Sequence, residues 1–113
     1  MDLNMFDIVK VPFPFTDKTA TKNRPALVLS SASRFNTTIG HSVMAMITSA
    51  AHTPWPLDCP ILDLESAGLP APSLVRFKLF TLDHRLVRAV LGQLSPSDQS
   101  AVRARLDQLF STT

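Results

Sequence analysis

The chain has 113 residues, of which 45% are hydrophobic and 18% are charged, and its net charge of +2 is mildly basic. This length fits one domain over residues 1–113, and this hydrophobic content excludes an intrinsically disordered chain. The mild basicity indicates a nucleic-acid partner only if the cations gather on one face. The single cysteine, Cys59, excludes an internal disulfide and a zinc site built from cysteine thiolates.

The sequence shows no pattern typical of secretion or of membrane insertion. The first residues lack a basic segment followed by an apolar one, so we expect no signal peptide. No apolar run reaches the roughly 18 residues that a membrane-spanning helix needs. A lone cysteine is consistent with a reducing compartment, and we therefore expect a soluble cytoplasmic protein without a membrane partner.

Two strands joined by a polar loop are predicted first. Residues 6–11 are rich in β-branched side chains and predict a strand. The prolines in residues 12–15 end it, because proline cannot donate to a strand ladder. Residues 16–23 are polar and aperiodic, which predicts a long hairpin loop of the kind that often carries binding residues.

The second strand follows this loop and begins beside a cation. Residues 26–29 form a short apolar run between Pro25 and Ser30, which predicts a buried strand. A residue before proline is pushed toward extended geometry, so Arg24 is expected at the mouth of the strand with little backbone freedom. A guanidinium held there can receive a phosphate or carboxylate, although a solvated surface arginine is the simpler interpretation. Residues 31–40 then predict a polar connection with at most one short helical turn.

The middle of the chain predicts a central strand and a shorter one. Residues 42–48 are nearly all apolar and predict a third strand, which ends at two adjacent hydroxyls, Thr48 and Ser49. Residues 57–62 predict a short fourth strand. Turn-forming residues follow it, and Gly68 is expected at positive φ because glycine has no Cβ to clash there.

A fifth strand is predicted by alternation over residues 73–82. With a period of two, Val75, Phe77 and Leu79 point to one face of the strand. Arg76 and its alternate neighbours point to the other, which is therefore a mixed basic face.

The C-terminal part predicts a last strand and a helix. Residues 83–85 predict a tight turn, and residues 86–91 a strand that Gly92 ends. Ser95 is a typical N-cap and Pro96 suits the first helical position. The apolar stripe expected on this helix consists of Val102, Leu106, Leu109 and Phe110. Five or six short strands closed by one helix predict a mainly β fold, a small, partly open antiparallel β-barrel with a C-terminal α-helix.

Most familiar catalytic patterns are missing. The sequence has no glycine-rich phosphate loop, no serine elbow, no tyrosine, no metal-ligand spacing among its histidines and no convincing carboxylate pair. We therefore expect no metal and no cofactor. Arg24 at one strand mouth and Thr48 at another strand end suit a substrate that supplies its own nucleophile, as RNA does with its 2′-hydroxyl.

Five short segments, in this order along the chain, resemble motifs of one known family. They are residues 7–13, 24–30, 47–49, 68–69 with 73–76, and 91–95. Each segment alone is weak evidence, but five in order are specific and cover nearly the whole chain. The chain thus resembles the MazF/PemK family of toxin endoribonucleases, or mRNA interferases.

The resemblance implies both a fold and an activity. The fold would be an SH3-like barrel with a C-terminal helix, acting as a homodimer. The activity would be metal-independent, sequence-specific cleavage of single-stranded RNA such as mRNA, leaving a 2′,3′-cyclic phosphate and a 5′-hydroxyl. A cognate antitoxin would dock its disordered C-terminal tail over the RNA groove. The family's catalytic pair maps onto Arg24 and Thr48, with Ser49 beside them.

Further roles follow from the resemblance and from the chemistry of the side chains. Because guanidinium holds its proton tightly, we expect Arg24 to stabilise phosphate charge rather than to exchange protons. Thr48 would donate to a non-bridging oxygen, and the group that accepts the 2′ proton stays open. The residues expected to bind RNA are Lys18, Lys22, Asn23, Ser49 and Arg76. A solvated loop or an ordinary surface cation is the competing interpretation for the charged ones.

The sequence also departs from the family pattern. Many members have glycine where this chain has Phe6, a basic residue where it has Asn23, and a lysine near residues 71–72, here Ala-Pro. These differences thin the positive charge of the groove and would alter RNA preference, weaken activity or mark an inactive regulatory member. Trp55, between two prolines, is interpreted either as an interface residue or as a stacking surface for a base.

A rival class is a toxin that binds rather than cleaves. The same barrel is used by toxins similar to CcdB, which dock on DNA gyrase, and fold alone does not separate the two. Those toxins resemble one another at a C-terminal tryptophan. Here the chain ends Leu-Phe-Ser-Thr-Thr over residues 109–113, which argues against gyrase.

Overall fold

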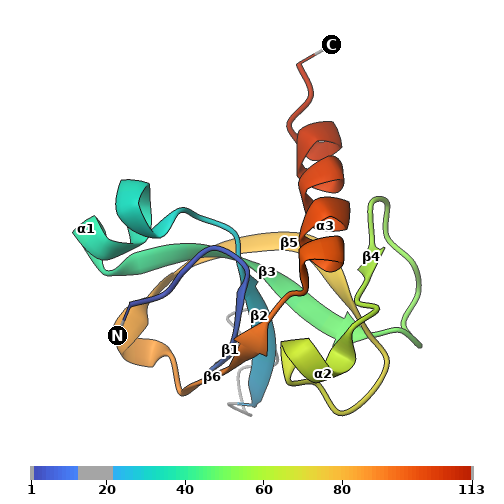
Figure 1. Cartoon of the computed structure of the whole chain (residues 1–113), viewed down its shortest axis with the longest axis horizontal. Helices are drawn as coiled ribbons and strands as arrows, with labels where there is room; N and C mark the ends of the chain where they lie inside the picture. Colours follow the sequence, from blue (N-terminus) through green and yellow to red (C-terminus); the bar gives the residue numbers. More distant parts are fainter. Residues whose placement is uncertain (1, 13–21, 113) are drawn as a thin grey trace.

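The structure is a computed structural model that describes residues 2–12 and 22–112 (Figure 1). Six strands form one antiparallel sheet in the order β4-β5-β3-β2-β1-β6. The strands are β1 (Asp7–Pro12), β2 (Asn23–Val28), β3 (His41–Ser49), β4 (Cys59–Pro60), β5 (Ser73–Asp83) and β6 (Ala89–Gln93). The helical segments are η1 (Ala32–Asn36), α1 (Thr37–Ile39), α2 (Leu64–Ala67), η2 (His84–Leu86) and α3 (Pro96–Leu109). This architecture confirms the predicted mainly β fold, a partly open antiparallel barrel with a C-terminal helix.

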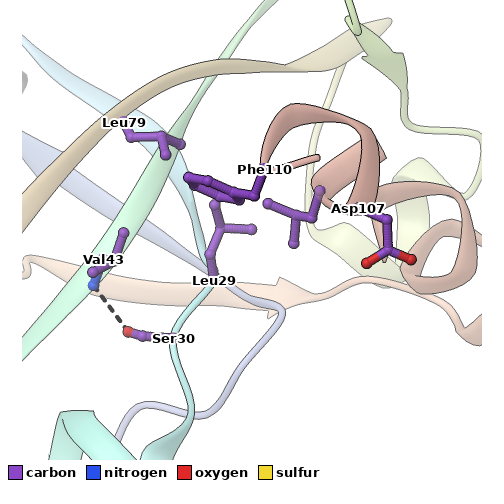
Figure 2. A pocket seen from close by; sticks show the side chains of 7 residues that line it. Leu29, Ser30, Val43, Leu79, Asp107 and Phe110 are labelled. Atoms are coloured by element: carbon purple, nitrogen blue, oxygen red, sulfur yellow. Dashed lines mark hydrogen bonds between the residues drawn. The ribbon is translucent and has the colours of Figure 1, made fainter. Parts of the chain in front are cut away.

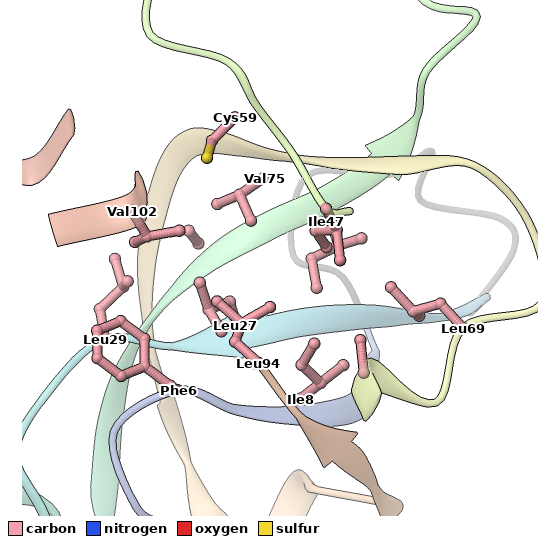
Figure 3. Close-up of a cluster of buried hydrophobic side chains, with 13 residues drawn as sticks. Phe6, Ile8, Leu27, Leu29, Ile47, Cys59, Leu69, Val75, Leu94 and Val102 are labelled. Atoms are coloured by element: carbon pink, nitrogen blue, oxygen red, sulfur yellow. The ribbon is translucent and has the colours of Figure 1, made fainter. Parts of the chain in front are cut away.

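Side chains are buried on both faces of the curled sheet, as strand periodicity requires. One face packs against α3, and we call it the helix face. Its core includes Ile8, Leu27, Ile47, Val75 and Val102 (Figure 3). The opposite face, which we call the distal face, carries Val9, Val11, Ala26, Val28 and Met44. The alternation predicted for the fifth strand is confirmed, since Phe77 and Leu79 join Val75 on the helix face while Phe80 packs on the distal face.

Phe6, which stands where many relatives of the predicted family have glycine, adopts a positive φ of 73°. This left-handed region disfavours residues with a Cβ, so the position suits glycine on backbone grounds. Phe6 is nevertheless buried, with 2% of its surface exposed, and the Arg103 guanidinium lies 4.9 Å from its ring centroid. Burial of the ring on the helix face therefore offsets the backbone strain.

Helix α3 begins as the sequence predicts but does not bury its whole apolar stripe. The Asp98 N–H donates to the Ser95 hydroxyl at 3.2 Å, which confirms Ser95 as the cap. Val102 is buried, whereas Leu109 and Phe110 are 37% and 65% exposed. The prediction of a buried stripe is wrong for these two residues, because the last turns of α3 extend away from the sheet (Figure 1). No helix within the described ranges is long and apolar enough to cross a membrane.

The predicted fourth strand is shorter than expected. Over residues 57–62, only Cys59–Pro60 pairs with β5. The backbone N–H groups of Leu62 and Asp63 donate instead to the buried carboxylate of Asp98, at 3.0–3.2 Å. The chain therefore leaves the sheet after two residues and docks against the first turn of α3.

Helical turns replace several predicted turns and shift one strand. Residues 31–40 contain η1 and α1, and residues 63–70 contain α2. The turn predicted at 83–85 is η2, so the last strand starts later than predicted, at Ala89. The Asp83 carboxylate accepts from the Arg85 N–H at 2.9 Å, which starts η2 and explains the later strand.

Helix α2 packs backbone to backbone against β6. Gly68 adopts the predicted positive φ, at 71°, and a Cβ there would lie 2.1 Å from the Leu91 carbonyl oxygen. Gly92 lies within β6 rather than ending it, and a Cβ on it would lie 2.4 Å from the Ser66 carbonyl oxygen. The Ser66 hydroxyl also donates to the Gln93 carbonyl at 2.7 Å. The segment between β4 and β5 is thereby held against the opposite edge of the sheet, which half closes the barrel.

Candidate functional site

Arg24 and Thr48 line the same pocket. Antiparallel pairing sets Ala26 opposite Met46, and the same register, continued by two residues, sets Arg24 opposite Thr48. A pocket of about 250 Å³ opens there, at the end of the sheet. Its lining residues are Arg24, Pro25, Ile47, Thr48, Ser49, Leu69, Pro70, Ala71, Pro72 and Ser73. Two side chains that are distant in the sequence are therefore brought to one cavity by strand pairing alone.

The Arg24 guanidinium carries an unsatisfied donor. Its Nε is buried and has no hydrogen-bond partner among the described residues. An unpartnered buried donor costs about 1–3 kcal/mol, and more when the group is charged. Pro25 follows directly and restricts the Arg24 backbone, so the side chain starts from a fixed position. This arrangement leaves a cation with a free N–H at the pocket, which is suited to an anionic acceptor.

Hydroxyl groups make up the rest of the pocket's polar lining. Thr48 is nearly buried, with 6% of its surface exposed. The Ser49 hydroxyl accepts from the Ala51 N–H at 3.3 Å, and the Ser73 hydroxyl donates to the Ala71 carbonyl at 2.8 Å. None of the described residues that line the pocket is a carboxylate. A lining that, over the described residues, has one guanidinium, three hydroxyls and no acid favours a phosphate-like ligand.

The wall opposite the strands comes from residues of which the family resemblance placed only 71–72 at the groove. Leu69, Pro70, Ala71 and Pro72 run from the end of α2 to the start of β5. Two prolines in four residues make this wall stiff, since each fixes its own φ. The Pro-Ala-Pro pattern in the sequence indicates a stiff segment, but it does not indicate which strand ends that segment faces.

Of the other residues expected to bind RNA, Ser49 alone is among the described residues that line the pocket. Lys22 and Asn23 are exposed beside Arg24, with Asn23 paired to Pro12 at the edge of the site. Ser49 lines the pocket itself. Lys18 lies outside the described residues, as does most of the loop predicted over residues 16–23.

Arg76 is buried in an ion pair rather than exposed on the strand. The β4–β5 register, continued by one residue, sets it opposite Asp58, whose carboxylate accepts from Arg76 Nη2 at 2.9 Å and from Nε at 3.2 Å. Nη2 also donates to the Thr53 carbonyl at 2.7 Å. The guanidinium carbon lies 5.1 Å from the centroid of the Trp55 ring. Direct contact of Arg76 with RNA stays a prediction, and this geometry does not favour it, because Nε and Nη2 are already engaged by Asp58 and Thr53.

The ionisation of Asp58 follows from these contacts. Burial raises the pKa of this carboxyl, but the hydrogen bond from Arg76, the Trp55 N–H and the Arg76 charge together hold the pKa below its usual value. The pair is therefore ionised near neutral pH.

Acid is expected to weaken this pair. Because the pKa of Asp58 is lower in the folded chain than the usual value of about 3.9, its stabilisation is complete above that value. It is lost as the pH falls through the lower, folded-state pKa. We expect the acid-induced loss of thermal stability to be smaller in Asp58→Asn than in the wild type, measured by melting curves between pH 7 and pH 3. Equal acid sensitivity of the two proteins would contradict this assignment.

A second pocket, of about 370 Å³, has a different character (Figure 2). It lies between the last turn of α3 and strands β2, β3 and β5, and its lining includes Leu29, Val43, Leu79 and Phe110. The Ser30 hydroxyl at its edge accepts from the Val43 N–H at 2.9 Å. This cavity is mainly apolar and carries no group of side chains suited to phosphate chemistry.

Comparisons with known proteins agree with this fold. The family described as PemK-like, MazF-like toxin of type II toxin–antitoxin system matches residues 4–110. A MazE–MazF crystal structure (Form-III) from Deinococcus radiodurans is similar with a TM-score of 0.77 and 23% identity, covering 100% of both chains. Mycobacterium tuberculosis toxin MazF-mt6 is similar with a TM-score of 0.73 and 19% identity, covering 95% of this chain and 98% of the other.

A third solved structure is an endoribonuclease in complex with its cognate antitoxin from a mycobacterial species. Its TM-score is 0.71 at 13% identity, covering 95% of this chain and 91% of the other. No curated protein sequence matches the chain. At these identities the solved structures establish the fold, and the family match over residues 4–110 establishes the family.

Proposed function

This chain belongs to the PemK-like, MazF-like family of toxins of type II toxin–antitoxin systems, and on that basis we propose that it is an endoribonuclease that cleaves single-stranded RNA without a metal ion. The observation that carries the proposal is the buried, unpartnered Nε of Arg24 in one pocket with Thr48. A pocket whose described lining has a cation, hydroxyls and no carboxylate suits a phosphodiester. A structural neighbour from a mycobacterial species is itself called an endoribonuclease.

The proposed reaction uses a nucleophile that RNA supplies. The 2′-oxygen attacks the adjacent phosphorus, a P–O2′ bond forms, and the P–O5′ bond breaks. The 2′-hydroxyl loses its proton, and the departing 5′-oxygen gains one. The products are a 2′,3′-cyclic phosphate and a 5′-hydroxyl. Arg24 and Thr48 donate to the non-bridging oxygens, whose negative charge grows in the transition state, and such fixed donors are worth about 3 kcal/mol each.

Residues around the pocket extend the proposed RNA site. Ser49 lines the pocket, while Lys22 and Asn23 are exposed at its edge. We assign these residues, with Lys18, to contacts with the RNA backbone, because phosphate contacts fix the register of a bound strand. In the same proposal the toxin acts in the cytoplasm as a homodimer, and the tail of a cognate antitoxin covers the site. Neighbouring MazF structures contain the antitoxin MazE, which supports this partner.

The test is cleavage of a long single-stranded RNA by purified protein in the presence of EDTA. We expect cleavage to persist in EDTA and the 5′ fragment to end in a 2′,3′-cyclic phosphate, detected by mass spectrometry. The matched control is the same sequence with a single 2′-deoxy nucleotide on the 5′ side of the cleaved bond, which removes the nucleophile. Cleavage of the deoxy substrate, or loss of activity in EDTA, would refute the mechanism.

A further inference from the structure

Trp55 is an exposed aromatic ring with a charged support. It is the single tryptophan of the chain, and 44% of its surface is exposed. The Arg76 guanidinium lies against the ring, 5.1 Å from its centroid. Arg76 is in turn held by Asp58 and by the Thr53 carbonyl. The ring is therefore fixed on one side by a buried ion pair and faces solvent with the rest of its surface.

Arg76, against which the ring packs, is close to Thr48 of the pocket lining in the strand pairing. In β3, Met46 and Thr48 alternate onto the distal face, and they pair with Arg76 and Leu74 of β5. Thr48 and Arg76 are thus diagonal neighbours across two adjacent strands, roughly 7–8 Å apart. Because Trp55 packs against Arg76, we place its ring next to the proposed phosphate site.

The turn that carries Trp55 is rigid. The Asp58 carboxylate accepts from the Trp55 N–H at 2.8 Å, and the Asp58 N–H donates to the Trp55 carbonyl at 3.3 Å. Between them Leu57 has a positive φ of 67°, which is strained for a residue with a branched side chain. Such strain persists only where the surrounding contacts enforce it. The Asp58–Arg76 pair supplies those contacts, so the ring is oriented before any ligand arrives.

We propose that Trp55 is a stacking platform for the base of a nucleotide next to the scissile phosphate, with Asp58 and Arg76 as positioning residues. This inference rests on the proposed RNA cleavage, because it places the base relative to a phosphate held at Arg24 and Thr48. Every base has a π face, and aromatic side chains bind single strands by stacking in this way. A flat ring with a cation next to the pocket suits a base better than it suits an apolar protein surface.

Fluorescence reports directly on this residue. The chain has one tryptophan and no tyrosine, so its emission excited at 295 nm comes from Trp55 alone. The probe is a fully 2′-deoxy single-stranded oligonucleotide, which cannot be cleaved by 2′ attack. We expect saturable quenching by this probe. An abasic sugar–phosphate oligomer of the same length and charge is expected to bind with little quenching.

Kinetics of RNA cleavage test the same residue without spectroscopy. Trp55→Ala is expected to raise KM by about 5- to 150-fold with a much smaller change in kcat, and Trp55→Phe is expected to lie between. The matched control is Phe110→Ala, which removes another exposed aromatic ring, at the end of α3. That variant should keep wild-type kinetics. Far-UV circular dichroism and melting curves check that each variant folds.

The outcomes separate this inference from the proposed function. If the wild type cleaves RNA, but Trp55→Ala keeps its KM or the abasic oligomer quenches equally, the platform is refuted and the nuclease stands. If the wild type is quenched by the base-containing probe alone yet cleaves no RNA, the nuclease is refuted, and stacking on Trp55 stands only for a strand that is bound without being cleaved. If the wild type neither cleaves RNA nor binds the probe, both are refuted.

Discussion

Replacing Arg24 by alanine is expected to lower the rate constant of RNA cleavage by about 100- to 1,000-fold, because it removes a fixed donor from the charge that develops on phosphorus. The fold should be unaffected or slightly more stable, since the buried Nε of Arg24 has no partner among the described residues. The measurement is single-turnover cleavage of a labelled single-stranded RNA at saturating enzyme, with a melting curve for each protein. A loss of activity together with unchanged or higher stability marks a functional residue.

Conservative substitutions of Arg24 and Thr48 test which property of each side chain supports cleavage. Arg24→Lys keeps the charge but loses the planar fork of donors, so it should retain only part of the activity. Thr48→Ser keeps a hydroxyl, and Thr48→Val keeps the shape without it, so activity should survive in the first and fall in the second. If both residues act on one phosphate, the Arg24→Ala/Thr48→Val double variant should be less impaired than the product of the single effects. Full activity in Arg24→Ala would remove the basis of the proposed mechanism.

Replacing Asp58 by alanine should have the largest effect on stability, about 3–5 kcal/mol. The side chains of Arg76 and Asp58 are only 9% and 11% exposed, so the variant leaves a buried guanidinium without its carboxylate. The Trp55 N–H loses its acceptor as well. Urea unfolding followed by Trp55 emission measures the change in the free energy of unfolding and the loss of ring packing together.

A double variant distinguishes the charge effect from simple loss of packing. Asp58→Leu with Arg76→Met replaces the ion pair by apolar side chains, which is often close to neutral for stability. We expect this protein to be markedly more stable than Asp58→Ala and yet to show a raised KM for RNA, since the support of Trp55 is gone. If the double variant is as unstable as Asp58→Ala, the unpaired charge of Arg76 is not the cause of the lost stability.

The pocket could be predicted because strand order and strand ends determine it. Arg24 lies at the start of a buried strand and Thr48 near the end of the next, so antiparallel pairing brings both to one edge. The family motifs point to the same two residues. What sequence patterns do not contain is the opposite wall, because the segment at Leu69–Pro72 reaches the site only through packing of α2 on β6.

The ion pair of Arg76 and Asp58 could not be predicted from the alternation of residues along a strand. Alternation in β5 correctly separates Arg76 from Val75, but it says nothing about a partner 18 residues away. That partner, Asp58, stands before a strand of two residues, too short to give a periodic signal. The helix stripe failed for a related reason, since a period of 3.6 identifies an apolar face but not how far the sheet extends beneath it.

The contact between α2 and β6 connects Gly92 with the wall of the pocket that follows α2. Gly92 contributes no atom to the pocket, yet the α2 backbone approaches it so closely that any side chain there would displace α2. The residues that follow α2 form one side of the cavity, so such a displacement would change the distance between that side and Arg24. Under the proposed function, substrate preference is therefore open to adjustment from the outermost strand, through the spacing of main chains rather than through any residue proposed to contact RNA.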